Sequence, residues 1–137
     1  MTVPQMILGW VVEWPKGICM IQHISAVTLA VQDMARSVEF YEKLGFKVAY
    51  GGLRSAFTTL RSGDAFVNLS AESRYEHRWW GRVIFRFDHV DAHHRTLETQ
   101  ELPVEVPRDA PWGERFFHVT DPDGHELSFA ELLPARS

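Results

Sequence analysis

The sequence predicts an α+β protein built from two tandem βαβββ units. The first observation is that residues 26–31 and 83–87 both show strand-like alternation, and each segment is followed by residues with helical periodicity. The second is that further strand-like segments follow each expected helix, so the order of elements repeats along the chain. The third is that 137 residues, of which 45% are hydrophobic and 23% charged, suit one globular domain.

The first unit begins with residues 26–31, where small or polar residues alternate with large apolar ones, as in a half-buried strand. Asp33 is placed to cap a helix that extends to about Leu44, and Gly45 is the expected residue after its C-terminus. Three strands are predicted after this helix, at residues 46–50, 56–61 and 64–70.

The second unit repeats this order with a shorter helix, which Asp91 is expected to cap and which extends to about Gln100. The turn Asp121-Pro122-Asp123-Gly124 has proline and glycine where a four-residue type I turn takes them. That turn would place Phe117 across from Ser128 on the neighbouring strand. The strands expected in this unit are residues 83–87, 104–106, 116–120 and 126–130.

The residues before the first expected strand differ from the rest, because Pro and Gly interrupt them and no regular alternation is present. One interpretation is that Met20 is the start, with residues 1–19 as an upstream extension. The other is that Trp10 and Trp14 anchor an additional strand or a partner-binding arm. We expect an extension at residues 1–20 and one domain at 21–133, with module one at about 21–72 and module two at about 80–133.

Composition excludes several classes of protein. Cys19 is the only cysteine, so an internal disulfide is impossible and a cysteine-based zinc site is disfavoured. The net charge of −4 argues against a nucleic-acid partner, because such binders are typically basic. The longest apolar run, residues 6–12, is too short to cross a membrane and lacks the flanks of a secretory signal, so we expect a cytoplasmic protein without a membrane partner.

Two motifs carry a family resemblance. The pattern VTLAVxDxxxSxxFYxxLGF at residues 27–46 resembles the first module of the vicinal oxygen chelate superfamily, which includes glyoxalase I, extradiol dioxygenases, and fosfomycin- and bleomycin-resistance proteins. The pattern PWGxRxFxVxDPDG at residues 111–124 resembles the closing segment of the bleomycin-resistance-like branch. The resemblance implies the glyoxalase/bleomycin-resistance fold, with tandem βαβββ modules forming a cup-shaped mixed sheet, and a homodimer.

The resemblance also implies a divalent metal held at four strand positions, where superfamily enzymes have His, Glu or Gln. Ala26 at the first position has no donor atom, and Arg82 is a permanent cation without a lone pair. Asn68 and Ser128 offer only weak neutral oxygens. We therefore expect neither a metal at this position nor another cofactor, although His23 or His118 remains a candidate for a relocated ligand.

Strand alternation from these four positions predicts what lines the cup. Phe66, Phe117 and Trp112 would offer flat apolar surfaces for a planar ligand. Arg82 either pairs with an acid group of that ligand or forms a salt bridge with Glu126. The ligand-binding residues expected in the cup are Ala26, Thr28, Phe66, Asn68, Arg82, Ile84, Trp112, Phe117, Glu126 and Ser128.

Two functions that use the cup are consistent with these residues, and a third interpretation is an interaction or regulatory subunit in which the cup is vestigial and residues 1–19 serve as the docking element. The first is a non-catalytic binding protein that takes a small, partly aromatic molecule, which Arg82 in the cup would favour as neutral or anionic and not as a cation such as bleomycin. The second is a metal-dependent lyase, isomerase or dioxygenase of the glyoxalase type, with relocated histidine ligands. Trp79 and Trp80 are expected at a dimer interface or at the mouth of the cup.

Overall fold

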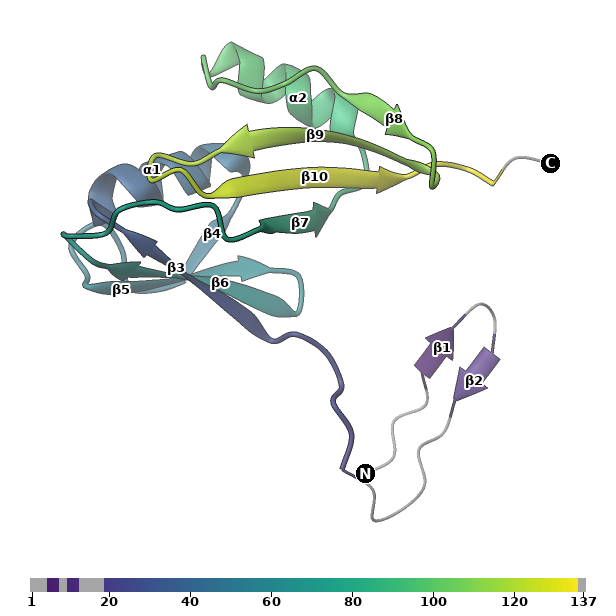
Figure 1. The fold of residues 1–137 in the computed structure, drawn as a ribbon, viewed down its shortest axis with the longest axis horizontal. Helices are drawn as coiled ribbons and strands as arrows, with labels where there is room; N and C mark the ends of the chain where they lie inside the picture. The colour runs from purple at the N-terminus through teal and green to yellow at the C-terminus, as the bar shows by residue number, and fades with distance from the viewer. Residues whose placement is uncertain (1–4, 8–9, 13–18, 136–137) are drawn as a thin grey trace.

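In the computed structural model, which describes residues 5–7, 10–12 and 19–135, both expected βαβββ units are present (Figure 1). Within each four-stranded sheet the first strand of the unit lies at one edge and pairs in parallel with the last strand, and the remaining pairs are antiparallel. The first sheet has the order β3-β6-β5-β4 and the second β7-β10-β9-β8. The predicted α+β class and the tandem repeat are therefore confirmed.

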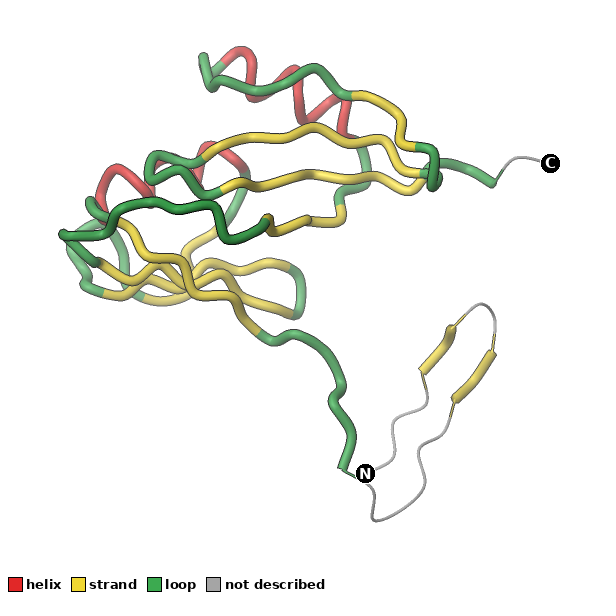
Figure 2. The backbone as a smooth tube through the Cα atoms, in the orientation of Figure 1, coloured by secondary structure: helices red, strands yellow, loops and turns green. Residues whose placement is uncertain are grey.

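The bounds of the elements follow the sequence patterns closely in the first unit. Figure 2 shows the two helices in red and the strands of both sheets in yellow. The first unit contains β3 (Ala26–Val31), α1 (Met34–Leu44), β4 (Lys47–Tyr50), β5 (Phe57–Ser62) and β6 (Ala65–Ala71). The second contains β7 (Arg82–Arg86), α2 (Val90–Thr99), β8 (Arg108–Ala110), β9 (Glu114–Thr120) and β10 (Glu126–Leu132).

Two expectations for the second unit are wrong. Asp91 is not the N-cap of helix α2: the N-cap is His89, which makes no side-chain hydrogen bond there. Asp91 lies in the first turn, where its negative charge interacts favourably with the helix dipole. Residues 104–106 form no strand, and only Val104 makes an isolated bridge to β9. Prolines flank this segment at 103 and 107 and restrict the backbone before each of them, so the edge strand β8 begins only at Arg108.

Before Cys19 the structure describes only two short strands. Strand β1 (Gln5–Ile7) pairs antiparallel with β2 (Trp10–Val12), and among the described residues they form a sheet of their own. The strand containing Trp10 agrees with one of the two interpretations of this segment, whereas Trp14 lies outside the described residues.

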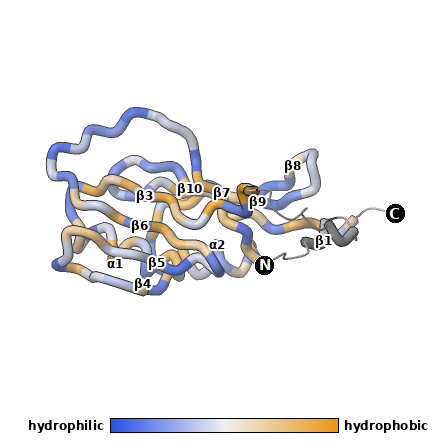
Figure 3. Tube along the Cα trace, turned by 90° about the horizontal axis from the view of Figure 1, so that it is seen from below, coloured by the Kyte–Doolittle hydropathy of each residue, from blue (hydrophilic) through white to orange (hydrophobic). Residues whose placement is uncertain are grey.

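One apolar core joins the two units, because the large residues of every main strand point to the helix side of its sheet. The ring of Phe46 from the first unit lies 5.0 Å from that of Phe85 in the second. In Figure 3 the apolar residues, in orange, concentrate along the strands. The largest fully buried side chains are Tyr41, Phe117, Leu29, Leu44, Leu60, Leu69, Leu97 and Leu127.

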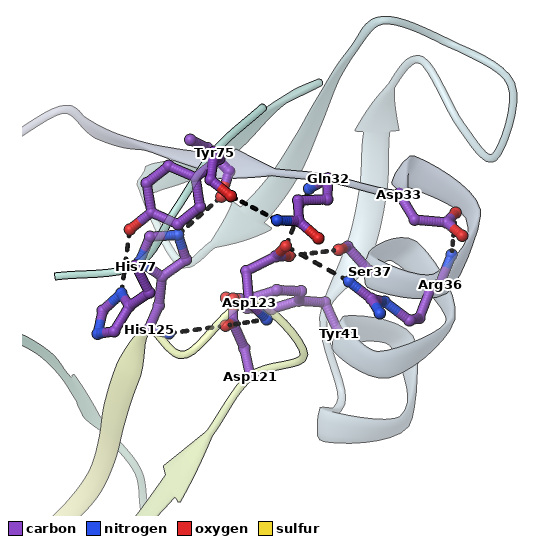
Figure 4. A network of polar contacts seen from close by, with 11 residues as sticks. Gln32, Asp33, Arg36, Ser37, Tyr41, Tyr75, His77, Asp121, Asp123 and His125 are labelled. Carbon is purple, nitrogen blue, oxygen red and sulfur yellow. Dashed lines mark hydrogen bonds and ion pairs between the residues drawn. The ribbon is translucent and has the colours of Figure 1, made fainter. Parts of the chain in front are cut away.

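A buried polar network also joins the units, where the turn between β9 and β10 meets the start of α1 (Figure 4). The Tyr41 hydroxyl donates to Asp121 Oδ2 over 2.7 Å. The Ser37 hydroxyl donates to the carboxylate of Asp123 over 3.2 Å, and the amide N–H of Gln32 donates to the same group over 2.9 Å. Burial, followed by the nearby Asp121, raises the pKa of Tyr41 well above its ordinary value.

His125 contacts both the first unit and the segment that links the two units. Its Nε2–H donates to the carbonyl oxygen of Ala30 over 2.7 Å, and its Nδ1 accepts from the indole N–H of Trp80 over 2.8 Å. Because an indole only donates and a carbonyl only accepts, these contacts assign the donor role to Nε2 of His125 and the acceptor role to Nδ1. The arrangement places Trp80 beside the first strand of the second unit.

Candidate ligand-binding site

The concave face of the second sheet, opposite to the core, bears the side chains that form the candidate site. On β10 the residue Ser128 pairs with Ile84 of β7 on one side and with His118 of β9 on the other, so these three side chains share a face. They border a hollow of about 250 Å³. Its lining residues are Arg82, Ile84, Arg108, Trp112, Glu114, Phe116, His118, Ser128 and Ala130.

The structure corrects the expected place of Phe117. This residue pairs with Phe129, lies on the core side and is only 1% exposed, so it does not line the hollow. The cause is the turn, in which Gly124 adopts φ +96° and the N–H of Asp121 donates to the carbonyl of His125 over 2.9 Å. The connection is thus one residue longer than a four-residue type I turn, and every side chain of β9 changes face.

Phe116 and His118 therefore occupy the face expected for Phe117. The glycine that ends the Asp-Pro-Asp-Gly sequence was the available signal, since a type I turn followed by a left-handed glycine is a common three-residue hairpin connection. Sequence reasoning also missed Arg108 and Glu114, which line the hollow from the edge of the sheet. No sequence pattern indicated the short strand that positions Arg108.

Arg82 forms the salt bridge with Glu126 that was one of its two expected roles. The guanidinium Nη2 lies 2.8 Å from Glu126 Oε2, and the indole N–H of Trp79 donates to the same oxygen over 2.9 Å. The Trp79 hydrogen bond and the charge of Arg82 lower the pKa of Glu126. The positive charge of Arg82 is thus balanced inside the site.

A second paired carboxylate lies at the other end of the hollow. Glu114 Oε2 is 2.8 Å from Arg86 Nη1, and Glu114 Oε1 accepts from the indole N–H of Trp112 over 2.6 Å. The Trp112 ring is 70% exposed and nearly parallel to the ring of Phe116, with centroids 6.3 Å apart and an interplanar angle of 18°. The guanidinium carbon of Arg108 lies 4.8 Å from the centroid of Phe116.

His118 is the one histidine that lines this hollow among the described residues. Its Nδ1 lies 2.5 Å from the hydroxyl oxygen of Ser128. Burial, together with the charges of Arg82 and Arg108, lowers the pKa of His118, whereas Glu105 opposes this shift. A neutral imidazole is therefore favoured at neutral pH, and it can exchange a hydrogen bond with the serine.

The remaining predicted residues lie mainly on the first sheet. Asn68 donates to the Thr28 hydroxyl over 3.2 Å, and its Oδ1 accepts from Thr59 over 2.8 Å. Ala26 and Phe66 border a second hollow of about 350 Å³, together with Arg82 and Ile84, where edge strands β3 and β7 approach each other. The structure thus brings Ala26 and Phe66 close to the second sheet, and keeps Thr28 and Asn68 in a polar row on the first.

The donor set does not fit the divalent metal that the family resemblance implies. Ala26 has no donor, the guanidinium of Arg82 is engaged by Glu126, and Asn68 and Ser128 are neutral and hydrogen-bonded to protein groups. Within residues 19–135 the structure contains no group of three His, Cys, Asp or Glu side chains arranged to hold a metal ion. His23, the other candidate for a relocated ligand, is exposed ahead of β3.

Comparison with known proteins agrees with this fold. The sequence model described as the Glyoxalase/Bleomycin resistance protein/Dioxygenase superfamily matches residues 21–129, and the chain belongs to this superfamily. In the part of the chain that the structure describes, no helix is long and apolar enough to span a membrane.

Three solved structures share the architecture. A bleomycin resistance determinant encoded on transposon Tn5 is 20% identical with a TM-score of 0.69, over 81% of this chain and 98% of its own. Lactoylglutathione lyase from Agrobacterium tumefaciens is 21% identical with a TM-score of 0.68, over 81% and 94%. A bleomycin-binding protein complexed with bleomycin is 21% identical with a TM-score of 0.65, over 81% and 98%. At these identities the likeness concerns the fold.

Proposed function

We propose that this protein binds a small, partly aromatic or anionic molecule on the concave face of its second sheet, and that it does so without a resident metal. The observation that carries the proposal is the hollow of about 250 Å³ whose walls combine exposed aromatic rings with arginines. Polar and aromatic groups converge there from four elements of one rigid sheet. This composition suits a ligand with a flat apolar body and a polar end.

Retention of the fold without its metal ligands further supports a binding role. The family positions that would coordinate a metal instead contain Ala26, Asn68, Arg82 and Ser128, and of these Arg82 and Ser128 line the hollow. Among the solved structures with this fold, one is named as a bleomycin-binding protein in complex with bleomycin. Binding of a small molecule is thus a use that this fold supports in another protein.

We also propose that the protein acts as a homodimer. Large apolar side chains are exposed on the concave faces of both sheets, including Tyr50 at 69%, Phe57 at 40% and Ile84 at 64%. Contiguous exposed apolar surface on a sheet is typical of an interface or a ligand groove. A second chain that covers part of these faces would deepen the hollow around the ligand.

A thermal-shift screen of small aromatic and carboxylate compounds, run with and without EDTA, tests the binding function. We expect neutral or anionic aromatic compounds to raise the melting temperature equally under both conditions, because the proposed binding needs no metal. A ligand at one hundred times its Kd stabilises a protein by about 2.7 kcal/mol, so the shift is measurable. Ile84→Trp, which fills the hollow, should abolish the shift, whereas Val106→Trp, at a residue 76% exposed outside the hollow, should preserve it.

The competing function is a metal-dependent lyase, isomerase or dioxygenase in which His118 serves as a relocated ligand, and the position of His118 in the hollow favours it. Elemental analysis of the purified protein separates the two functions. One divalent ion per chain that is lost in His118→Ala, together with a compound shift that EDTA removes, would refute metal-free binding and favour the metal-dependent enzyme.

A further inference from the structure

Charge balance around the hollow singles out one arginine. Arg82 is paired with Glu126, Arg86 with Glu114, and Arg115, on the opposite face of β9, with Asp91 and Asp109 at 3.0 and 2.9 Å. Arg108 forms no ion pair with any described residue, and its guanidinium contacts the ring of Phe116. The charge available to a ligand in this hollow is therefore that of Arg108.

The acids near the hollow do not neutralise this charge. Glu105, whose charge opposes the lowering of the His118 pKa, does not line the hollow and forms no ion pair with Arg108 among the described residues. Both carboxylate oxygens of Glu114 are engaged, one by Arg86 and the other by the Trp112 indole. Glu126, next to the hollow, is held by Arg82 and Trp79. Because a paired carboxylate has little affinity left for a cationic ligand, the uncompensated Arg108 makes the site selective for an anion.

An aromatic platform adjoins this arginine. The rings of Trp112 and Phe116 are nearly parallel, and Arg108 lies over Phe116, so three planar groups follow one another along the wall. The hydrogen bond of 2.6 Å from Trp112 to Glu114 fixes the orientation of the exposed indole. A rigid exposed ring beside a free guanidinium is suited to a flat ring that bears an acid group.

From these contacts we propose that the ligand class is a planar aromatic monoacid, whose ring stacks on the exposed indole of Trp112 and whose carboxylate pairs with Arg108. The proposal rests on the proposed binding function and deepens it. One unpaired guanidinium accommodates one acid group through two parallel hydrogen bonds. A hollow of about 250 Å³ limits the ring system to about one or two rings, because pockets that take drug-sized ligands measure about 300–1,000 Å³.

Isothermal titration with three probes of one shape tests this assignment: naphthalene-2-carboxylate, naphthalene-2-carboxamide and 2-naphthylmethylammonium. We expect the carboxylate to bind about tenfold or more tightly than the amide, since hydrogen bonds to charged groups are stronger than neutral ones, and the ammonium to bind least. Carboxylate binding should weaken as salt is raised. Failure of the carboxylate to bind, or equal affinity for all three probes, would overturn the proposal.

Variants assign the roles. Arg108→Gln should weaken carboxylate binding about tenfold while leaving amide binding within about twofold, because the charge and the paired donors that hold the acid group are removed while the Trp112 ring remains. Arg61→Gln is the matched control: Arg61 lies 5.1 Å from the ring centroid of Phe66 on the first sheet, in the same kind of contact, and its loss should have no effect. Trp112→Leu should weaken both the carboxylate and the amide.

The outcomes distinguish failure of the ligand class from failure of the binding function. If Arg61→Gln weakens the carboxylate as much as Arg108→Gln does, the acid group is not recognised at Arg108 and the assignment is wrong. If other compounds of the thermal-shift panel bind while naphthalene-2-carboxylate does not, the ligand class fails although small-molecule binding stands. If nothing in the panel binds, the proposed function itself fails.

Discussion

Buried polar side chains in the described part of the chain have hydrogen-bond partners with one exception, and that exception lies on α2. His93 is 8% exposed and stacks on Phe87, with ring centroids 4.2 Å apart and an interplanar angle of 13°. Its Nε2 has no hydrogen-bond partner among the described residues. Burial lowers the pKa of His93, because the surrounding rings cannot solvate an imidazolium. The residue therefore behaves as an aromatic core side chain.

The pH dependence of stability should reflect this residue. In the unfolded chain a histidine titrates near its ordinary pKa of about 6.5, whereas folded His93 takes up its proton only at lower pH. As the pH falls through about 6.5, this histidine binds a proton in the unfolded state but not in the folded state. The free energy of unfolding therefore falls, and His93 contributes at most about 1.4 kcal/mol per pH unit to that fall.

His93→Phe should therefore lose less stability between pH 7 and pH 5 than the wild type, as measured by urea unfolding at each pH. His23, which is exposed ahead of β3, supplies the control variant His23→Asn, whose stability should follow that of the wild type as the pH falls. Identical profiles for His93→Phe and the wild type would contradict the role assigned to His93.

At the scale of elements, the turn between β9 and β10 decides which side chains reach the site. Its carboxylate Asp121 accepts from the N–H groups of Asp123 and His125 over 2.9 and 2.8 Å through Oδ1, and from Tyr41 through Oδ2. Burial raises the pKa of Asp121 despite these bonds. The turn thus fixes the pairing of β9 with β10 and attaches that hairpin to α1.

Gly124 is the residue of this turn that tolerates least change. A Cβ there would lie 2.7 Å from the ring of His77, and its φ of +96° is unfavourable for any L-residue with a side chain. Gly63 also has a positive φ, +58°, but open space around it. We expect Gly63→Ala to cost about 1–2 kcal/mol, the conformational term alone, and Gly124→Ala to cost more because His77 must also move.

Chemical denaturation of both variants checks this expectation. Equal losses of unfolding free energy would show that the linker residue His77 can move aside without a free-energy cost, and would contradict this expectation. A larger loss for Gly124→Ala, restored in part by His77→Ala in the same chain, would confirm that the turn and the linker are packed against each other.

At the scale of the whole molecule, one core serves both modules while their concave faces remain open. Phe46, Phe85 and Phe129 contact one another across the boundary between the modules, so the helix sides of the two sheets are mutually buried. Ile84 on β7 and Trp112 in the turn between β8 and β9 are left exposed at 64% and 70%. This distribution is the basis for proposing that a second chain covers part of the open faces.

Sedimentation equilibrium tests the proposed dimer. The wild type should have twice the chain mass of 15.8 kDa, and Ile84→Asp should shift the protein toward the single-chain mass, since a carboxylate would be buried in the interface. Val106→Asp, at a residue 76% exposed on the loop before β8, should remain dimeric. A wild type that sediments as a single chain at every concentration would exclude the homodimer.

The sequence by itself determined the α+β class, the repeated order of elements and the ends of α1, because these depend on local periodicity and on capping residues such as Asp33 and Gly45. The family resemblance together with strand alternation also predicted that Arg82, Ile84 and Ser128 share one face, and in the structure all three line the same hollow. Alternation carries such a prediction along a strand because neighbouring side chains point to opposite faces.

Only the tertiary structure decided which arginine of the hollow has no ion pair among the described residues. The pairing of Arg82 with Glu126, of Arg86 with Glu114, and the absence of an ion pair at Arg108 among the described residues depend on contacts across strands. The tertiary structure likewise decided that Phe116 and His118, and not Phe117, face the hollow. The turn with the left-handed Gly124 sets the pairing of β9 with β10, and this pairing holds along all of β9. Long-range register and charge pairing are properties of the assembled sheet, and no local pattern encodes them.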